Sequence, residues 1–253
     1  MAYITDWQKE YEDLKSVEDM SEYRQARVFT TKAGADRPIL ELNIAKSYQR
    51  NILENDEQLV IPIFGQPGSG KSTLMLWMEY FLTGDIDFDT TCFTHDQWAE
   101  ESTKEQKGNI IKYEEGRQTF VKRRAMSGNN KDGLDILSIY RAKNNVHFIN
   151  FQNISDVEES LLFFHADALL WTHRLFDEKG WVSAYSPKTL QQEDLQKKIK
   201  GGSISPGQPE ADLITRFPRF DTEHPDIWKK YEETKMDNLN RIRSKYEIGR
   251  AHV

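Results

Sequence analysis

Strand-length and helix-length apolar segments alternate through the middle of the chain. LVIPIF (59–64) is a continuous apolar run of strand length, and residues 72–84 are apolar nearly all round and stop at Gly84, as a buried helix does. Further strands are predicted at 90–93, 109–113, 146–151, 166–173 and 181–186, with helices at 94–105, 134–143 and 155–164. This alternation predicts a three-layer α/β fold, with helices on both faces of a mostly parallel sheet.

The two ends of the chain have a different pattern. Residues 5–25 and 41–54 have the spacing of helices, and the Gly, Pro and Ser content of 201–210 is typical of an exposed loop. One long helix is predicted over 224–249, with an apolar stripe of Ile227, Tyr231, Met236, Leu239, Ile242 and Tyr246. The predicted domains are an N-terminal helical arm (1–56), an α/β core (57–190), and a loop and C-terminal helix that pack on the core (191–253).

Composition and charge limit the class of protein. The net charge of -7 argues against a surface that is basic all round, although it allows a local basic track. The chain has neither an apolar window of membrane-spanning length nor the pattern of a signal peptide, which predicts a soluble, cytoplasmic protein without membrane contact. The single cysteine, Cys92, excludes an internal disulfide and a cysteine-based zinc site, and we expect it to be buried.

A phosphate-binding loop is the most specific signal in the chain. GQPGSGKS (65–72) matches the G-x-x-x-x-G-K-[ST] pattern and lies between a predicted strand and a predicted helix, where the pattern must lie to function. Lys71 is expected to contact the β- and γ-phosphates, and the Ser72 hydroxyl to bind Mg2+. The predicted nucleotide-binding residues are Gly65, Gln66, Pro67, Gly68, Ser69, Gly70, Lys71, Ser72 and Thr73.

Two adjacent carboxylates follow the strand predicted at 109–113. Ligand sites in open α/β sheets lie at the carboxyl ends of the strands, so Glu114 and Glu115 are candidates for holding Mg2+ and activating water. One predicted strand and one predicted helix separate the helix at 72–84 from this acidic pair, so the sheet has room for an inserted strand. That order favours ATPases with an added catalytic glutamate over kinases and GTPases. The alternative is that both glutamates are solvated turn residues before Gly116. Lys112 is an unusual residue inside a strand predicted to be buried.

The order GQPGSGKS, IIKYEEGR, YRAKNN and HFINFQNISD resembles that of the FtsK/HerA group of motor ATPases, which includes Zot-like and viral genome-packaging ATPases. The resemblance covers residues 57–175 and implies a RecA/FtsK-like P-loop NTPase core that uses ATP and Mg2+. The group has Asp-Glu where this chain has Glu114 and Glu115. By the same resemblance, Gln152 corresponds to the sensor of the γ-phosphate, with a simple turn residue as the alternative.

A ring-shaped motor also needs a cation from a neighbouring subunit at the transferring phosphate. Arg141 is the first candidate, followed by Arg124 and Arg117, and a surface ion pair is the alternative for Arg141. The loop predicted at 125–133 is expected either to be an ordinary exposed loop or to touch the DNA backbone through Lys122, Arg123, Arg124 and Lys131.

The predicted function is therefore an ATP-hydrolysing motor that moves double-stranded DNA as a homo-oligomeric ring, for translocation or genome packaging. One alternative is a small-molecule or nucleoside kinase, with a lid over 187–220 that carries Arg216 and Arg219. The other is a nucleotide-gated assembly factor with slow hydrolysis.

Overall fold

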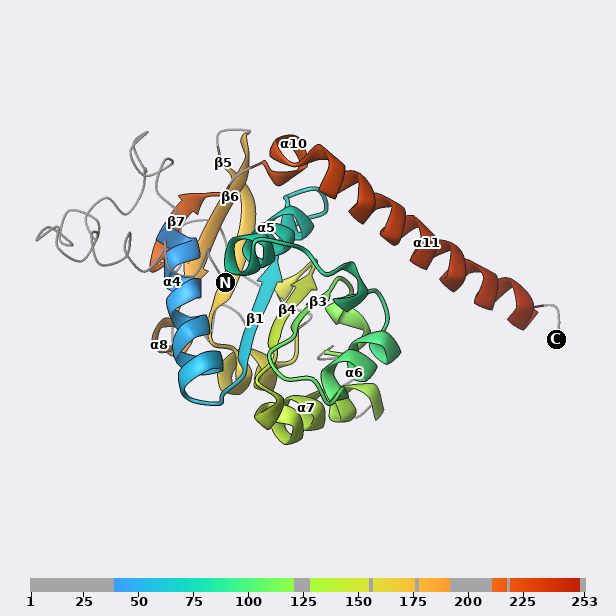
Figure 1. The fold of residues 1–253 in the computed structure, drawn as a ribbon, viewed down its shortest axis with the longest axis horizontal. Helices are drawn as coiled ribbons and strands as arrows, with labels where there is room; N and C mark the ends of the chain where they lie inside the picture. Colours follow the sequence, from blue (N-terminus) through green and yellow to red (C-terminus); the bar gives the residue numbers. More distant parts are fainter. Residues whose placement is uncertain are drawn as a thin grey trace, which may run out of the picture.

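The computed structural model describes residues 39–120, 128–154, 157–175, 178–191, 211–217 and 219–250. The central sheet contains seven strands in the order β2-β3-β4-β1-β5-β6-β7 (Figure 1). Their bounds are β1 Leu59–Phe64, β2 Thr91–Cys92, β3 Ile110–Tyr113, β4 Val146–Phe151, β5 Leu169–Leu175, β6 Glu178–Tyr185 and β7 Leu213–Arg216. The strands from β2 to β5 pair in parallel, whereas β5, β6 and β7 pair antiparallel.

The strand order brings three carboxyl ends together. Strand β4 lies between β1 and β3, with Phe64 opposite Phe151 and Tyr113 opposite Ile149. Every residue of β1 and β4 is buried, which explains their continuous apolar runs. The inserted strand that the sequence leaves room for is therefore β4, and the residues after β1 and β3 emerge at the same edge of the sheet.

Helices cover both faces of the sheet, as predicted. On one face, α4 (Ile39–Tyr48) and α5 (Lys71–Thr83) pack on alternate strand residues that include Ile61 and Phe148. On the other face lie α6 (His95–Thr103), α7 (Gly128–Ile139), α8 (Pro187–Leu190) and the π-helical segment Leu161–His165. The molecule thus has the predicted three-layer α/β architecture.

Local sequence signals account for several helix ends. Helix α5 stops because Gly84 adopts a left-handed conformation (φ 78°) and its N–H bonds to the Tyr80 carbonyl at 2.7 Å. Helix α6 starts with a capping box, in which Thr94 Oγ1 accepts from the Gln97 amide and Gln97 Oε1 accepts from the Thr94 amide. Cys92 is buried as expected, and burial raises the pKa of its thiol to about 12.

Several predicted boundaries need correction. Strand β7 extends the sheet beyond residue 190, where the sequence places the end of the core. The strand predicted at 181–186 begins earlier, because β6 starts at Glu178, and residues 128–133 form the start of helix α7 instead of a loop. The helix predicted over 5–25, the basic residues 122–124 and the loop predicted over 201–210 lie outside the described residues. None of the described helices is long and apolar enough to cross a bilayer.

The C-terminal helix α11 (Pro225–Arg250) follows the short helix α10 (Phe220–Glu223) and projects away from the sheet (Figure 1). Its first half packs on α5, where Phe220 and Tyr231 join Leu76 in a buried apolar cluster. Met236 is 53% exposed and Leu239 is 47% exposed, so the predicted stripe is only partly buried. Met236 and Leu239 lie on a different side of the helix from Tyr231 and Ile242, which contact the apolar cluster.

A buried ion pair explains the unusual lysine of β3. Lys112 is fully buried, and its Nζ lies 2.6 Å from Glu79 Oε2 on α5. The ammonium also donates to the Asp87 carbonyl and to Thr90 Oγ1, each at 2.8 Å. These contacts give the charge the partners that it needs in an apolar interior.

Candidate nucleotide-binding site

The phosphate loop connects β1 to α5, as the sequence predicts. Gly68 and Gly70 have φ values of 75° and 100°, in the left-handed region that favours glycine. Gly65 is required for a different reason, because a Cβ there would lie 2.3 Å from the Thr172 carbonyl oxygen. Helix α5 begins at Lys71 directly after the loop, so its positive N-terminal end faces the space that the loop surrounds.

The Lys71 ammonium lies against the loop itself. Its Nζ donates to the carbonyl oxygens of Gly65 at 2.8 Å and of Gln66 at 3.2 Å. Burial lowers the pKa of Lys71, while the negative charges of Glu114 and Glu115 raise it. The cation thus lies at the N-terminal end of α5, and a positive charge at that position suits a polyphosphate.

The remaining predicted loop residues differ in exposure. Gln66, Pro67 and Gly68 are exposed, whereas Ser69 and Thr73 are buried. Ser69 Oγ lies 2.7 Å from Thr172 Oγ1 on β5, so its hydroxyl faces the sheet instead of the phosphate space. Its contribution to a nucleotide would therefore be limited to the backbone.

Ser72 and Glu114 meet across the mouth of the loop. Ser72 Oγ donates to Glu114 Oε2 at 2.9 Å, and Asn150 Nδ2 donates to the same oxygen at 2.7 Å. Asn150 is buried on β4, where it pairs with Ile63 of β1. The structure thus brings together the two residues that the sequence assigns to Mg2+, and it adds Asn150.

The donor set fits Mg2+. A hydroxyl and a carboxylate are hard oxygen ligands, and adjacent corners of an Mg2+ octahedron lie about 2.9 Å apart. The separation of 2.9 Å between Ser72 Oγ and Glu114 Oε2 matches that distance. Among the described residues, no cluster of three or more histidine, cysteine or acidic side chains forms a metal site, so a cation here would also need phosphate or water ligands.

Glu115 differs from its neighbour. It is more exposed to solvent than Glu114, and the chain turns at once into the short helix Gly116–Gln118. Gly116 fits only without a side chain, since a Cβ would lie 2.5 Å from Ile149 Cγ2. Partial burial and the charge of Glu114 raise the pKa of Glu115, while Lys71, Lys235 and Arg117 lower it. A carboxylate with a raised pKa beside the phosphate loop is suited to accept a proton from water.

Tyr231 of helix α11 also reaches this site. Its hydroxyl donates to Glu114 Oε1 at 2.6 Å, and the whole residue is buried. Sequence reasoning placed Tyr231 on an apolar stripe, and no local motif distinguishes it from the other members of that stripe. Asn150 had a usable signal, because it is a lone amide within an otherwise apolar strand.

Two other predicted site residues lie apart from these contacts. Gln152 is exposed just beyond the end of β4, and Asn150 is the β4 side chain that contacts Glu114. Arg141 lies at the opposite edge of the sheet, where its Nη2 donates to Glu57 Oε1 at 2.9 Å. Within one chain Arg141 is far from the loop, and its action on a neighbouring subunit stays a prediction. Arg117 is exposed close to Glu115, and Arg124 lies outside the described residues.

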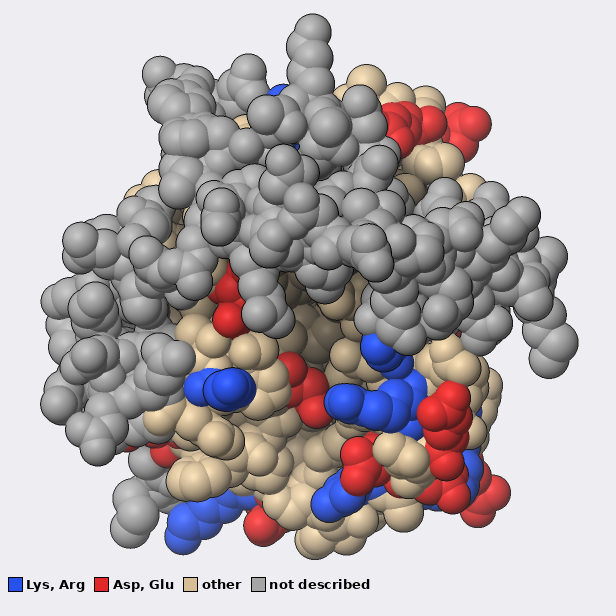
Figure 2. Space-filling model, turned by 90° about the vertical axis from the view of Figure 1, so that its left-hand side faces the viewer, with Lys and Arg blue, Asp and Glu red and all other residues tan. Residues whose placement is uncertain are grey.

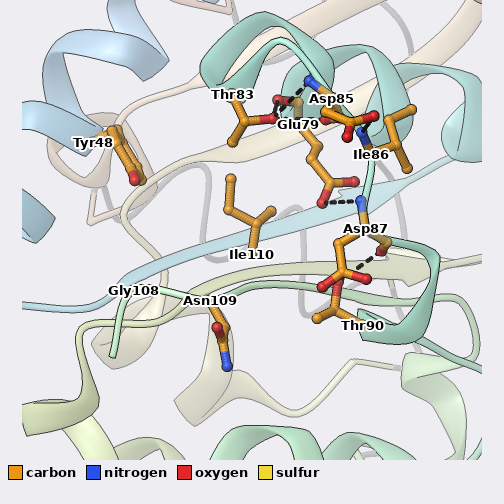
Figure 3. Close-up of a pocket in the computed structure, with 10 residues that line it drawn as sticks. All are labelled: Tyr48, Glu79, Thr83, Asp85, Ile86, Asp87, Thr90, Gly108, Asn109 and Ile110. Carbon is orange, nitrogen blue, oxygen red and sulfur yellow. Dashed lines mark hydrogen bonds between the residues drawn. The ribbon is translucent and has the colours of Figure 1, made fainter. Parts of the chain in front are cut away.

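A second hollow lies away from the phosphate loop. It has a volume of about 390 Å³ and is lined by residues from α4, α5 and β3 and from the loops beside them (Figure 3). Glu79, Asp85 and Asp87 face it, and the Asp87 amide donates to Glu79 Oε1 at 3.3 Å. This acidic lining disfavours a polyphosphate, so the phosphate loop remains the candidate nucleotide site.

Comparison with known proteins gives distant structural similarities only. No protein-family model and no curated protein matches the chain. The N-terminal domain of zonular occludens toxin from Neisseria meningitidis aligns with a TM-score of 0.43 at 15% identity, over 64% of this chain and 94% of that one. The genome packaging NTPase B204 from Sulfolobus turreted icosahedral virus 2, in complex with sulfate, aligns with a TM-score of 0.39 at 10% identity, over 54% and 95% of the two chains. The same NTPase in complex with ATP-gammaS gives a TM-score of 0.36 at 12% identity, over the same shares.

Proposed function

We propose that this chain binds ATP with Mg2+ at residues 65–72 and hydrolyses it to drive movement of double-stranded DNA as a homo-oligomeric ring. The observation that supports hydrolysis is the contact between Ser72 and Glu114 beside Lys71, with Glu115 exposed next to them. In this proposal Glu114 holds the metal and Glu115 orients the attacking water. When bound, Mg2+ would neutralise charge on the phosphates.

The position of the acidic pair supports an ATPase over a kinase. It follows β3, which is separated from the phosphate-loop strand β1 by the inserted β4. The two arginines of the lid expected for a kinase, Arg216 and Arg219, do not lie in a free loop over the phosphate site. Arg216 belongs to strand β7, and Arg219 donates to both carboxylate oxygens of Asp221 at 2.9 Å and 2.7 Å. Arg219 is therefore engaged with its own chain.

DNA as the partner is supported by the order of the sequence motifs, and it requires a local basic surface. Figure 2 shows one face of the molecule, on which basic and acidic side chains of the described residues are interspersed. A continuous basic track is not visible among the described residues of that face. Salt dependence would reveal a DNA contact, because phosphate contacts release counterions.

The decisive experiment is ATP hydrolysis by the purified protein with and without double-stranded DNA. DNA is expected to stimulate turnover, the stimulation should fall steeply as salt increases, and Glu115→Gln should abolish both basal and stimulated hydrolysis while ATP binding persists. Turnover that is indifferent to DNA would reject the motor and leave an ATPase. Transfer of phosphate to a small acceptor would support a kinase instead.

The pH dependence of hydrolysis tests Glu115 as the base. A general base acts only when deprotonated, so activity is lost as pH falls through its pKa. Because the pKa of Glu115 is raised above 4.5, the acidic limb of kcat/KM should lie above the range of an ordinary glutamate. Lys235→Ala removes a charge that lowers this pKa, so the limb should move to still higher pH. A limb that Lys235→Ala leaves in place would argue against Glu115.

A further inference from the structure

Both oxygens of the Glu114 carboxylate are engaged, and they face different elements. Oε2 accepts from Ser72 on α5 and from Asn150 on β4. Oε1 accepts from the Tyr231 hydroxyl on α11 at 2.6 Å. A cation that binds Ser72 would thus meet Oε2, and the contact between Tyr231 and Oε1 would remain in place.

The surroundings of Tyr231 keep its hydroxyl directed at Glu114. The residue is fully buried, and its ring packs on the Trp228 ring with the centroids 5.0 Å apart. Leu76, Phe93 and Phe220 complete the same apolar cluster. A phenol in such surroundings needs a polar acceptor for its O–H, and Glu114 accepts that hydrogen bond, with the Ser72 hydroxyl also interacting with the phenol. Burial and the charge of Glu114 raise the pKa of Tyr231, so the hydroxyl stays protonated and donates at all working pH values.

We propose that Tyr231 is a positioning residue for the metal-binding carboxylate, so that the C-terminal helix completes the nucleotide site. This inference rests on the proposed function of that site. It gives a physical reason for glutamate instead of the shorter aspartate at position 114. Glutamate has one more rotatable bond than aspartate, and its added length lets Oε1 reach α11 while Oε2 remains beside Ser72. The hydroxyl of Tyr231 fixes the additional torsion.

A double-mutant cycle tests this coupling. In Tyr231→Phe only the hydroxyl is lost, and the Mg2+ concentration needed for half-maximal binding of a fluorescent ATP analogue should rise roughly tenfold, as expected for loss of a hydrogen bond to a charged group. In Glu114→Asp the carboxylate is too short to reach α11, so adding Tyr231→Phe should change that concentration by less than about twofold. The steady-state rate of hydrolysis should follow the same pattern.

Tyr80→Phe is the matched control, since it removes the same atom from a ring that packs on Phe220 and His224 without contacting Glu114. It should leave the Mg2+ dependence unchanged. The proposal would be overturned if Tyr231→Phe raised the half-maximal Mg2+ concentration equally in the wild-type and Glu114→Asp backgrounds. It would also be overturned if Tyr231→Phe lowered the melting temperature without changing the Mg2+ dependence, or if it tightened Mg2+ binding. If the wild type binds the analogue with Mg2+ but does not hydrolyse ATP, the proposed hydrolytic function is rejected. The double-mutant cycle on Mg2+-dependent binding still decides the role of Tyr231.

Discussion

Replacing Lys71 with alanine is expected to lower the rate of ATP hydrolysis by roughly 10²- to 10³-fold, the usual cost of removing one preorganised donor from a transferring group. The ammonium lies inside the phosphate loop, where it donates to the Gly65 and Gln66 carbonyls. In the complex these bonds would give way to phosphate oxygens, whose developing charge the cation stabilises. Affinity for ATP should also fall, by roughly 10- to 100-fold, because a charge-assisted hydrogen bond is lost.

Two measurements separate this effect from misfolding. Wild-type protein should gain thermal stability in saturating ATP and Mg2+, and Lys71→Ala should lose that gain while keeping the melting temperature of the nucleotide-free protein. Lys229→Ala is the matched control, because Lys229 is an exposed lysine of α11 whose side chain is 77% accessible. It should behave as the wild type does. A Lys71→Ala protein that hydrolyses ATP at the normal rate would rule out residues 65–72 as the catalytic nucleotide site.

The local parts of this site were predictable from sequence. The phosphate loop depends on glycine backbone freedom and on a lysine and a serine at fixed spacing, all of which are visible within eight residues. The position of Glu114 and Glu115 at the edge of the sheet that carries the loop is predictable, because parallel strands end at one edge of a sheet. The predicted three-layer α/β fold class is confirmed. It was predictable because alternating apolar runs of strand and helix length allow few arrangements.

Long-range partners could not be found in this way. Tyr231 is 117 residues from Glu114 in the chain, and it reaches the carboxylate only because α10 and α11 fold back over α5. Nothing within its own helix specifies that contact. Strand β7 was missed because four residues at a sheet edge, after a polar segment, give too short a pattern to detect. The strand predicted at 146–151 includes Asn150. A lone amide in such an apolar strand is a signal of a buried polar contact, and the structure shows that Asn150 is buried.

Lys112→Met should destabilise the folded protein by roughly 3 to 5 kcal/mol, because it leaves the Glu79 carboxylate buried without its cation. Glu79 is 3% exposed, and Lys112 Nζ lies 2.7 Å from its Oε1 as well as 2.6 Å from Oε2. The deficit can be measured by chemical denaturation. Adding Glu79→Leu should recover much of it, since two apolar side chains can replace a buried pair at little cost. A single variant as stable as the wild type would contradict this account.

The pH dependence of that deficit follows from Glu79. Burial raises the pKa of Glu79 to about 7 even though Lys112 lowers it, so loss of Lys112 raises the pKa further. A carboxyl whose pKa is higher in the folded state than in the unfolded state makes the protein less stable as pH rises above the unfolded value of 4.5. The deficit of Lys112→Met should therefore shrink as pH falls from about 8 to about 5. A deficit that is constant over this range would mean that lost packing, and not the charge of Glu79, is its cause.

The same pair links stability to the nucleotide site. Lys112 of β3 precedes Glu114, which follows the strand directly, by two residues, and Glu79 follows Ser72 by seven residues, or about two turns, on α5. The two elements that meet at the hydrogen bond between Ser72 and Glu114 thus meet again at the buried ion pair. A shift of β3 against α5 would separate both contacts together. Lys112→Met/Glu79→Leu should then recover stability better than it recovers Mg2+-dependent ATP binding, because apolar side chains fill the space without fixing the position of the strand.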